Sequence, residues 1–82
     1  MAEVGSAMAL FFFNVYRDGA WSRDETGQEW PDCGMAFRAA KGIIATIVRD
    51  DAPTEDDRAA MLLQVTYDDR SELFRLPFTL GI

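Results

Sequence analysis

The stretch from Asp24 to Asp32, read Asp-Glu-Thr-Gly-Gln-Glu-Trp-Pro-Asp, separates an aromatic segment from the one long helical pattern of the chain. Thr26-Gly27 is typical of a tight turn, because glycine adopts a positive φ without a Cβ penalty. The proline pushes Trp30 into an extended conformation, and Asp32 is placed to accept hydrogen bonds from the first free N–H groups of a helix. The stretch therefore predicts a turn, an extended pair and a helix cap, in that order.

The segment from Cys33 to Arg49 places apolar residues every 3.6 positions and predicts one amphipathic helix. Its apolar stripe consists of Ala36, Phe37, Ala40, Ile43, Ile44 and Ile47. Gly42 costs about 1 kcal/mol relative to alanine without ending the helix. Asp50 and Asp51 oppose the negative end of the helix dipole and Pro53 prevents continuation, so the helix should end near residue 50.

Three other segments alternate apolar and polar residues, which is typical of half-buried β-strands. They are residues 10–17, 61–67 and 73–80. The last two are joined by a loop from Asp68 to Ser71, and Pro77 favours an edge position because it has no N–H for the sheet. A further short strand is expected around Trp21. Residues 54–60 form either a short helical turn or an acidic loop.

These elements predict a single α+β domain over residues 8–82, with a small antiparallel sheet of three to four strands and one helix packed on one face. The expected order is strand, optional short strand, helix, strand, strand. Residues 1–7 are small and polar, and we expect a flexible tail there. A domain of this size buries only roughly 60% of its unfolded surface, so a bound partner would add useful stability.

Aromatic residues lie on both faces of the first predicted strand. Phe11, Phe13 and Val15 share the face assigned to the core, whereas Phe12 and Tyr16 share the opposite face. Two explanations of the second face stay open: cover by the region around Trp21 and Trp30, or contact with a second copy or another protein. Large exposed aromatics are the usual anchors of interfaces. The candidate protein-contact residues are therefore Phe12, Tyr16, Trp21 and Trp30.

The chain is acidic, with a formal charge of −6 and a pI near 4.3. Its charge is uneven, since residues 33–49 sum to +3 without any acid while residues 50–60 sum to −4. The three cations of the helix, Arg38, Lys41 and Arg49, are too few to predict a phosphate-backbone binder. We therefore expect a protein partner or a homo-oligomer, and no direct binding of nucleic acid.

No residue pattern of the chain predicts catalysis. The sequence has no histidine, which removes histidine relays and the commonest zinc ligand. The acids between Asp18 and Asp32 lack the spacing of a calcium loop, so we expect no metal and no cofactor. Cys33 is the one cysteine, so it forms no internal disulfide, and its place on the apolar stripe predicts a buried, inert thiol. We expect a protein that is not an enzyme and has no small-molecule substrate.

The motif Asp-Glu-x-Gly-x-Glu-x-Pro-Asp at residues 24–32, after the aromatic run of residues 8–15 and before an alanine-rich helix, resembles a known family. That family comprises small proteins abundant in rhizobia and other alphaproteobacteria, catalogued as domain of unknown function 6894. The resemblance covers Met8 to about Leu80 and implies no activity. This chain departs from it at Leu10, where a basic residue is usual, and at Cys33-Gly34, where leucine and an acid are usual. A distant likeness of layout links it to HicB-type antitoxins.

We therefore expect a non-enzymatic module that binds protein or regulates it, with a homodimer as one form. The alternative is an acidic inhibitor, antitoxin-like or related to phage defence, that masks a basic nucleic-acid-binding surface of its target. The apolar run of residues 8–13 is too short to span a bilayer and lacks the flanks of a signal peptide. A cytoplasmic location follows as the expectation.

Overall fold

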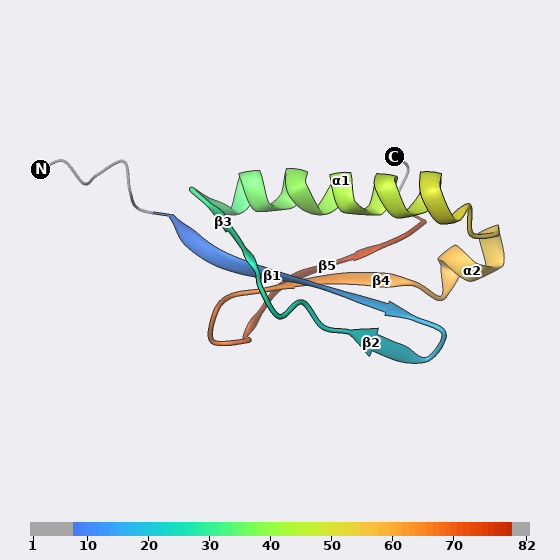
Figure 1. The fold of residues 1–82 in the computed structure, drawn as a ribbon, viewed down its shortest axis with the longest axis horizontal. Coiled ribbons are helices and arrows are strands. Elements are labelled where there is room, and N and C mark those ends of the chain that lie inside the picture. The colour runs from blue at the N-terminus through green and yellow to red at the C-terminus, as the bar shows by residue number, and fades with distance from the viewer. Residues whose placement is uncertain (1–7, 80–82) are drawn as a thin grey trace, which may run out of the picture.

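The computed structural model describes residues 8–79, in which a five-stranded antiparallel sheet lies against one long helix (Figure 1). The strands are β1 (Ala9–Arg17), β2 (Ala20–Ser22), β3 (Gln28–Trp30), β4 (Leu62–Thr66) and β5 (Glu72–Pro77). The helices are α1 (Cys33–Asp51) and α2 (Glu55–Ala59). This confirms the predicted α+β fold. The tail predicted for residues 1–7 lies outside the described residues.

The strands follow the order β2-β1-β4-β5, and β3 pairs with β1 outside this path. The nine residues of β1 provide room for both short strands, since β3 pairs with Ala9–Phe11 and β2 with Val15–Arg17. The stretch of residues 28–30 was expected only as an extended lead into the helix, and in the structure it is a strand. β5 lies at the edge of the sheet, as Pro77 predicted.

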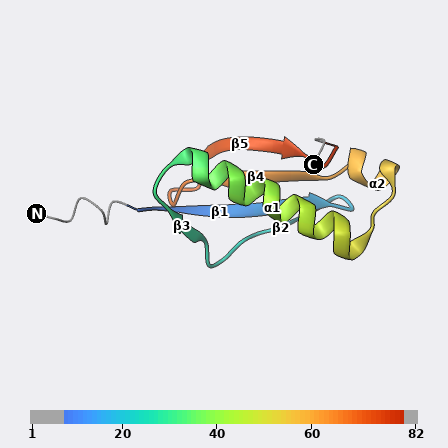
Figure 2. The same ribbon diagram turned by 90° about the horizontal axis from the view of Figure 1, so that it is seen from above.

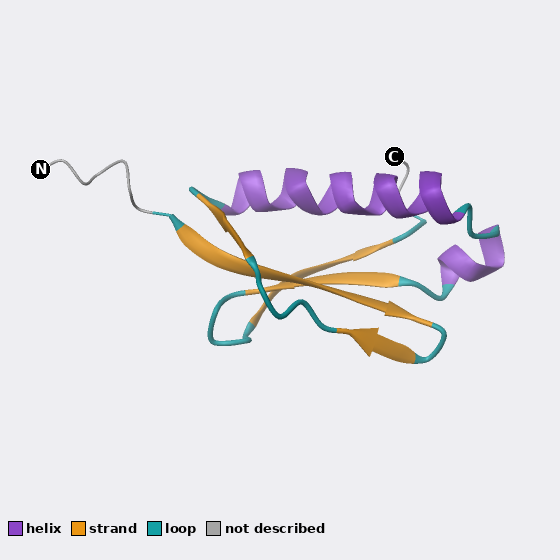
Figure 3. Ribbon diagram, viewed as in Figure 1, coloured by secondary structure: helices purple, strands orange, loops and turns teal. Residues whose placement is uncertain are grey.

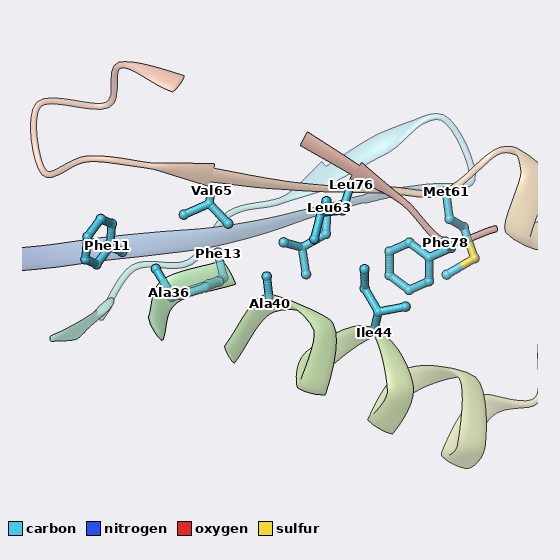
Figure 4. Close-up of a cluster of buried hydrophobic side chains, with 10 residues drawn as sticks. All are labelled: Phe11, Phe13, Ala36, Ala40, Ile44, Met61, Leu63, Val65, Leu76 and Phe78. Atoms are coloured by element: carbon cyan, nitrogen blue, oxygen red, sulfur yellow. The ribbon is translucent and has the colours of Figure 1, made fainter. Parts of the chain in front are cut away.

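The core lies between α1 and one face of the sheet (Figure 4). Ala36, Ala40 and Ile44 are fully buried, and the two small alanines allow the helix to pack closely on Phe13 and Leu63. The core face predicted for β1 is confirmed, since Phe11 and Phe13 belong to this cluster and Val15 packs against it. The remaining buried members of this cluster are Phe11, Met61, Val65, Leu76 and Phe78.

Phe37 corrects the predicted stripe, because its side chain is 38% exposed. Seen from above, α1 crosses the strands obliquely, with its first turns near β5 (Figure 2). Phe37 therefore lies at the side of the contact between helix and sheet. Its ring packs edge to face with the Phe74 ring, and the two ring centroids are 5.5 Å apart. A helical period gives the direction of a side chain, but it does not show where the sheet beneath it ends.

The predicted caps account for the ends of both helices. Asp32 is the N-cap of α1, and its Oδ1 accepts a hydrogen bond from the N–H of Met35 at 2.9 Å. The helix ends at Asp51, next to its predicted end near residue 50, and Asp51 Oδ2 accepts a hydrogen bond from Arg17 Nη1 at 2.8 Å. Residues 55–59 form a helix with a capping box between Thr54 and Asp57. The structure thus decides for the helical turn over the acidic loop.

Candidate functional site

The face of the sheet turned away from α1 is called here the open face (Figure 3). Its side chains form three rows across the strands, because paired residues of antiparallel neighbours point to the same side. The apolar row consists of Trp21, Tyr16, Leu62 and Pro77. The polar row consists of Asn14, Gln64 and Arg75. The third row consists of Phe12, Thr66 and Glu72.

The apolar row crosses four strands, one residue from each. Tyr16 and Trp21 pack ring against ring, with centroids 5.2 Å apart and planes at 57°. Both aromatics and Leu62 are half-buried, and Pro77 is exposed. At a strand spacing of about 4.8 Å the row is about 15 Å long. It is therefore a continuous apolar strip on which part of every side chain stays accessible.

Hydrogen bonds fix the side chains beside the apolar row. Asn14 Nδ2 donates to Gln64 Oε1 at 3.1 Å, and Gln64 Nε2 donates to Glu72 Oε1 at 2.9 Å. The same Glu72 oxygen accepts from Arg75 Nε at 2.7 Å. The bonds from Gln64 and Arg75 lower the pKa of the Glu72 carboxyl. Because these polar groups bond to one another, a partner meets an ordered surface.

Phe12 lies beneath other residues of the open face and is only 8% exposed. The Arg70 guanidinium stacks over its ring at 4.0 Å, and Gly27 packs so closely that an added Cβ would lie 3.0 Å from the ring. The sequence left open whether the region around Trp21 and Trp30 covers this face. Trp21 does pack on Tyr16, whereas Phe12 is covered by Arg70 and the Gly27 turn. Phe12 is therefore buried, which corrects its prediction as an exposed contact residue.

Trp30 lies on the other side of the sheet. It is opposite Ala9 in the register of β3 and β1, and it packs against the core beneath α1. Its Nε1 donates to Gln28 Oε1 at 3.0 Å. Of the four predicted contact residues, the structure therefore brings together Tyr16 and Trp21.

Leu62 and Pro77 complete the apolar row, and sequence reasoning did not include them among the contact residues. Both lie in the alternating segments 61–67 and 73–80 that the sequence predicted as strands. A sequence that gives faces but no register cannot show that Leu62 pairs with Tyr16 and Pro77 with Leu62. The strand register was therefore the information that was needed to find these two residues.

Asp24 holds the turn that borders the open face. Its Oδ2 accepts the N–H of Phe13 at 3.1 Å, in the gap between β3 and β2, and its Oδ1 accepts the N–H groups of Thr26 and Gly27 at 3.0 Å. Partial burial opposes ionisation, but these three bonds outweigh it and lower the pKa of Asp24. The N–H of Asp24 donates to Asn14 Oδ1 at 2.9 Å, which joins the turn to the polar row.

Cys33 is exposed, which corrects the prediction of a buried thiol. It occupies the first position of α1, three residues before Ala36, which is the first buried residue of the helix. Its Sγ lies 3.9 Å from Tyr67 Oη, and this contact raises the pKa of Tyr67. Among residues 8–79 no group of three or more acidic or cysteine side chains is placed to hold a metal ion.

No helix within the described part of the chain is long and apolar enough to cross a membrane.

The comparisons with known proteins return one family. The model of the family described as Domain of unknown function (DUF6894) matches residues 10–79, which is most of the chain and includes every strand and helix apart from the first residue of β1. No curated protein and no solved structure matches the chain.

Proposed function

We propose that this chain, which belongs to the DUF6894 family, is a non-enzymatic cytoplasmic module that binds another protein through the apolar row of its open face. The observation that carries the proposal is the row itself. Trp21, Tyr16, Leu62 and Pro77 stand side by side on four strands, and none of them is buried. Rigid aromatic side chains beside ordered polar groups are typical of protein interfaces.

The polar row supports the same proposal. A water-facing sheet surface usually carries mobile charged side chains. Here Asn14 is fully buried, and Gln64 is hydrogen-bonded to Asn14 on one side and to Glu72 on the other. A partner that covers the apolar row therefore displaces few ordered polar contacts, and little side-chain entropy is lost on binding.

Affinity capture from the cells that encode the protein tests the proposal. The bait is compared with Trp21→Thr, which places a residue of high strand propensity in edge strand β2 and removes the largest ring of the row. We expect the captured partner to be retained at least about tenfold less, as for an interface anchor worth about 1.4 kcal/mol or more. Met8→Thr is the matched control, because Met8 is an exposed hydrophobic residue outside the apolar row. Equal capture by Trp21→Thr, or loss only with Met8→Thr, contradicts the proposal.

A second candidate function is the masking of a basic target surface by an acidic inhibitor. It is supported by a run of exposed acids where α1 passes into α2, close to the start of β4 and thus to Leu62 of the apolar row. These acids are Asp50, Asp51, Glu55, Asp56 and Asp57. Glu55 and Asp56 also line a surface groove of about 400 Å³ that is completed by Arg58, Ala59 and Thr79.

Salt separates this candidate from purely apolar docking. If acids at the α1–α2 end face a basic partner, the affinity falls steeply between low and high salt. Glu55→Gln together with Asp56→Asn should then reduce the salt dependence, since both side chains are exposed and neither caps a helix. Capture that is indifferent to salt and to this double substitution excludes the inhibitor.

A further inference from the structure

We propose that two copies of this chain associate through the outer edge of β5, with the two β5 strands antiparallel about a twofold axis near Phe74. This goes beyond the proposed function, because it uses a different surface and holds whether or not the apolar row binds a partner. The occupant of the edge is a second copy of the chain, so the assembly is a closed, symmetric pair.

In the described part of the chain, residues 8–79, the outer edge of β5 is the long unpaired edge of the sheet. Phe78 donates its N–H to Met61 O at 3.2 Å, so the backbone groups of Phe78 point towards β4. Successive residues of a strand point their backbone groups alternately towards and away from the neighbouring strand. The N–H and C=O of Arg75, which lies opposite Gln64 and three residues before Phe78, therefore point away from β4. The opposite margin is divided between β2 and β3, with three residues each, and the side chain of Asp24 fills the gap between them. β5 has six residues, and no further strand among residues 8–79 pairs with its outer side.

An incomplete aromatic cluster lies over this edge. Phe37 of α1 and Phe74 of β5 meet edge to face, and Phe37 remains 38% exposed. Among residues 8–79, Met8 and Phe37 are the large hydrophobic residues that are more than a third exposed, and Phe37 is the one packed on an edge strand. A second copy brings an equivalent pair of rings, so the two pairs cover each other across the axis.

The distribution of charge favours a second copy at this place. Two chains of charge −6 repel, and the repulsion is least where few acids face each other. The first turns of α1, which lie near β5, carry Arg38 and Lys41 and no acid, and Lys41 Nζ lies over the Phe37 ring at 5.6 Å. Glu72 on β5 is paired with Arg75 at 2.7 Å. The middle of the edge is therefore neutral to basic, although Asp68 and Asp69 lie in the hairpin at one of its ends.

Side-chain chemistry also selects the register. A register centred on Phe74 sets the two Phe74 rings opposite each other, where aromatic pairs stabilise a sheet. If the twofold axis lay at Arg75 instead of Phe74, Arg75 would lie opposite Arg75 of the other copy, and like charges directly opposite are destabilising. Pro77 has no N–H to donate, so pairing is confined to Glu72–Leu76. Such a short interface predicts weak association, observable at high protein concentration.

Sedimentation equilibrium of the full chain from about 10 μM to about 1 mM tests the proposal. We expect the mass to rise from that of one chain towards that of two. Phe37→Arg should weaken association at least about tenfold, because it removes a ring and sets cations against each other across the axis. Met8→Arg, at the other exposed hydrophobic residue, should leave association unchanged. A monomer at every concentration, or a dimer indifferent to Phe37→Arg, overturns the proposal.

Amide exchange of the unmodified protein gives a readout that needs no substitution. The outward N–H of Arg75 should exchange rapidly in dilute protein and at least about tenfold more slowly at high concentration, where the second copy accepts its hydrogen bond. Gly19, in the β1–β2 turn, should exchange at the same rate throughout. If the mass doubles while Arg75 exchange stays constant, the copies meet elsewhere and the proposal fails.

Discussion

At the scale of single residues, Asp24 and Gly27 explain why the acidic stretch has the composition it has. The sequence predicted the turn at Gly27 and the cap at Asp32, because both follow from local backbone chemistry. It could not predict that Asp24 accepts the N–H of Phe13, eleven residues away, since that contact exists only once β1 and the turn lie together. Asp24 and Asp32 thus have structural roles, because both accept hydrogen bonds from backbone N–H groups.

We predict that Gly27→Ala destabilises the fold by roughly 2–4 kcal/mol. Gly27 has φ +79°, and an added Cβ would lie 2.9 Å from Leu10 Cδ1 and 3.0 Å from Phe11 O. Gly19→Ala is the control, because Gly19 has φ +77° and no atom within 4 Å of such a Cβ. It should cost only the backbone strain of about 1–2 kcal/mol. Urea unfolding of both variants measures the difference, and equal losses would show that the close approach is unimportant.

The low pKa of Asp24 predicts a dependence of stability on pH. A carboxyl whose pKa is lowered by folding stabilises the native state at pH values above its unfolded pKa, and this contribution is lost as the pH falls through the folded pKa. The loss for Asp24 therefore begins near its ordinary value of 3.8 and continues below it. Asp24→Asn should be less stable than the unmodified protein at pH 7, and the difference should shrink on acidification below about 4. A difference independent of pH would rule out the carboxylate as its source.

At the scale of elements, α1 was the most predictable part of the chain, since its start, period and end all have local causes. Phe37 and Cys33 depart from the prediction because burial depends on how far the sheet extends beneath the helix, which the helical period does not contain. β3 was missed for a different reason: three residues are too short to show an alternation. Its pairing depends on the length of β1.

Gly42→Ala should stabilise the protein by about 0.5–1 kcal/mol, because it lowers the backbone entropy of the unfolded chain at an exposed position in the middle of α1. No atom lies within 4 Å of the Cβ it would add. Gly34→Ala is the matched control and should gain less, since its Cβ would meet the capping oxygen Asp32 Oδ1 at 3.3 Å. Thermal or urea unfolding measures both. A loss of stability with Gly42→Ala would mean that this part of the helix is not formed as described.

At the scale of the whole molecule, the candidate site depends on the register of four strands. The sequence showed which residues alternate to the face away from the core, and it identified Tyr16 and Trp21. It could not align Leu62 and Pro77 with them, because hydrogen-bonded register is a property of the folded sheet. It also could not show that Arg70 covers Phe12, since the cover comes from a hairpin 58 positions further along the chain.

Photo-crosslinking inside the cells that encode the protein tests whether the apolar row contacts the partner. A photoreactive phenylalanine analogue replaces Trp21 in one variant and Arg38, on the solvent side of α1, in another. We expect a crosslinked partner from position 21 and none from position 38. Crosslinking from position 38 alone, or a partner that is captured without any crosslink from position 21, would contradict it.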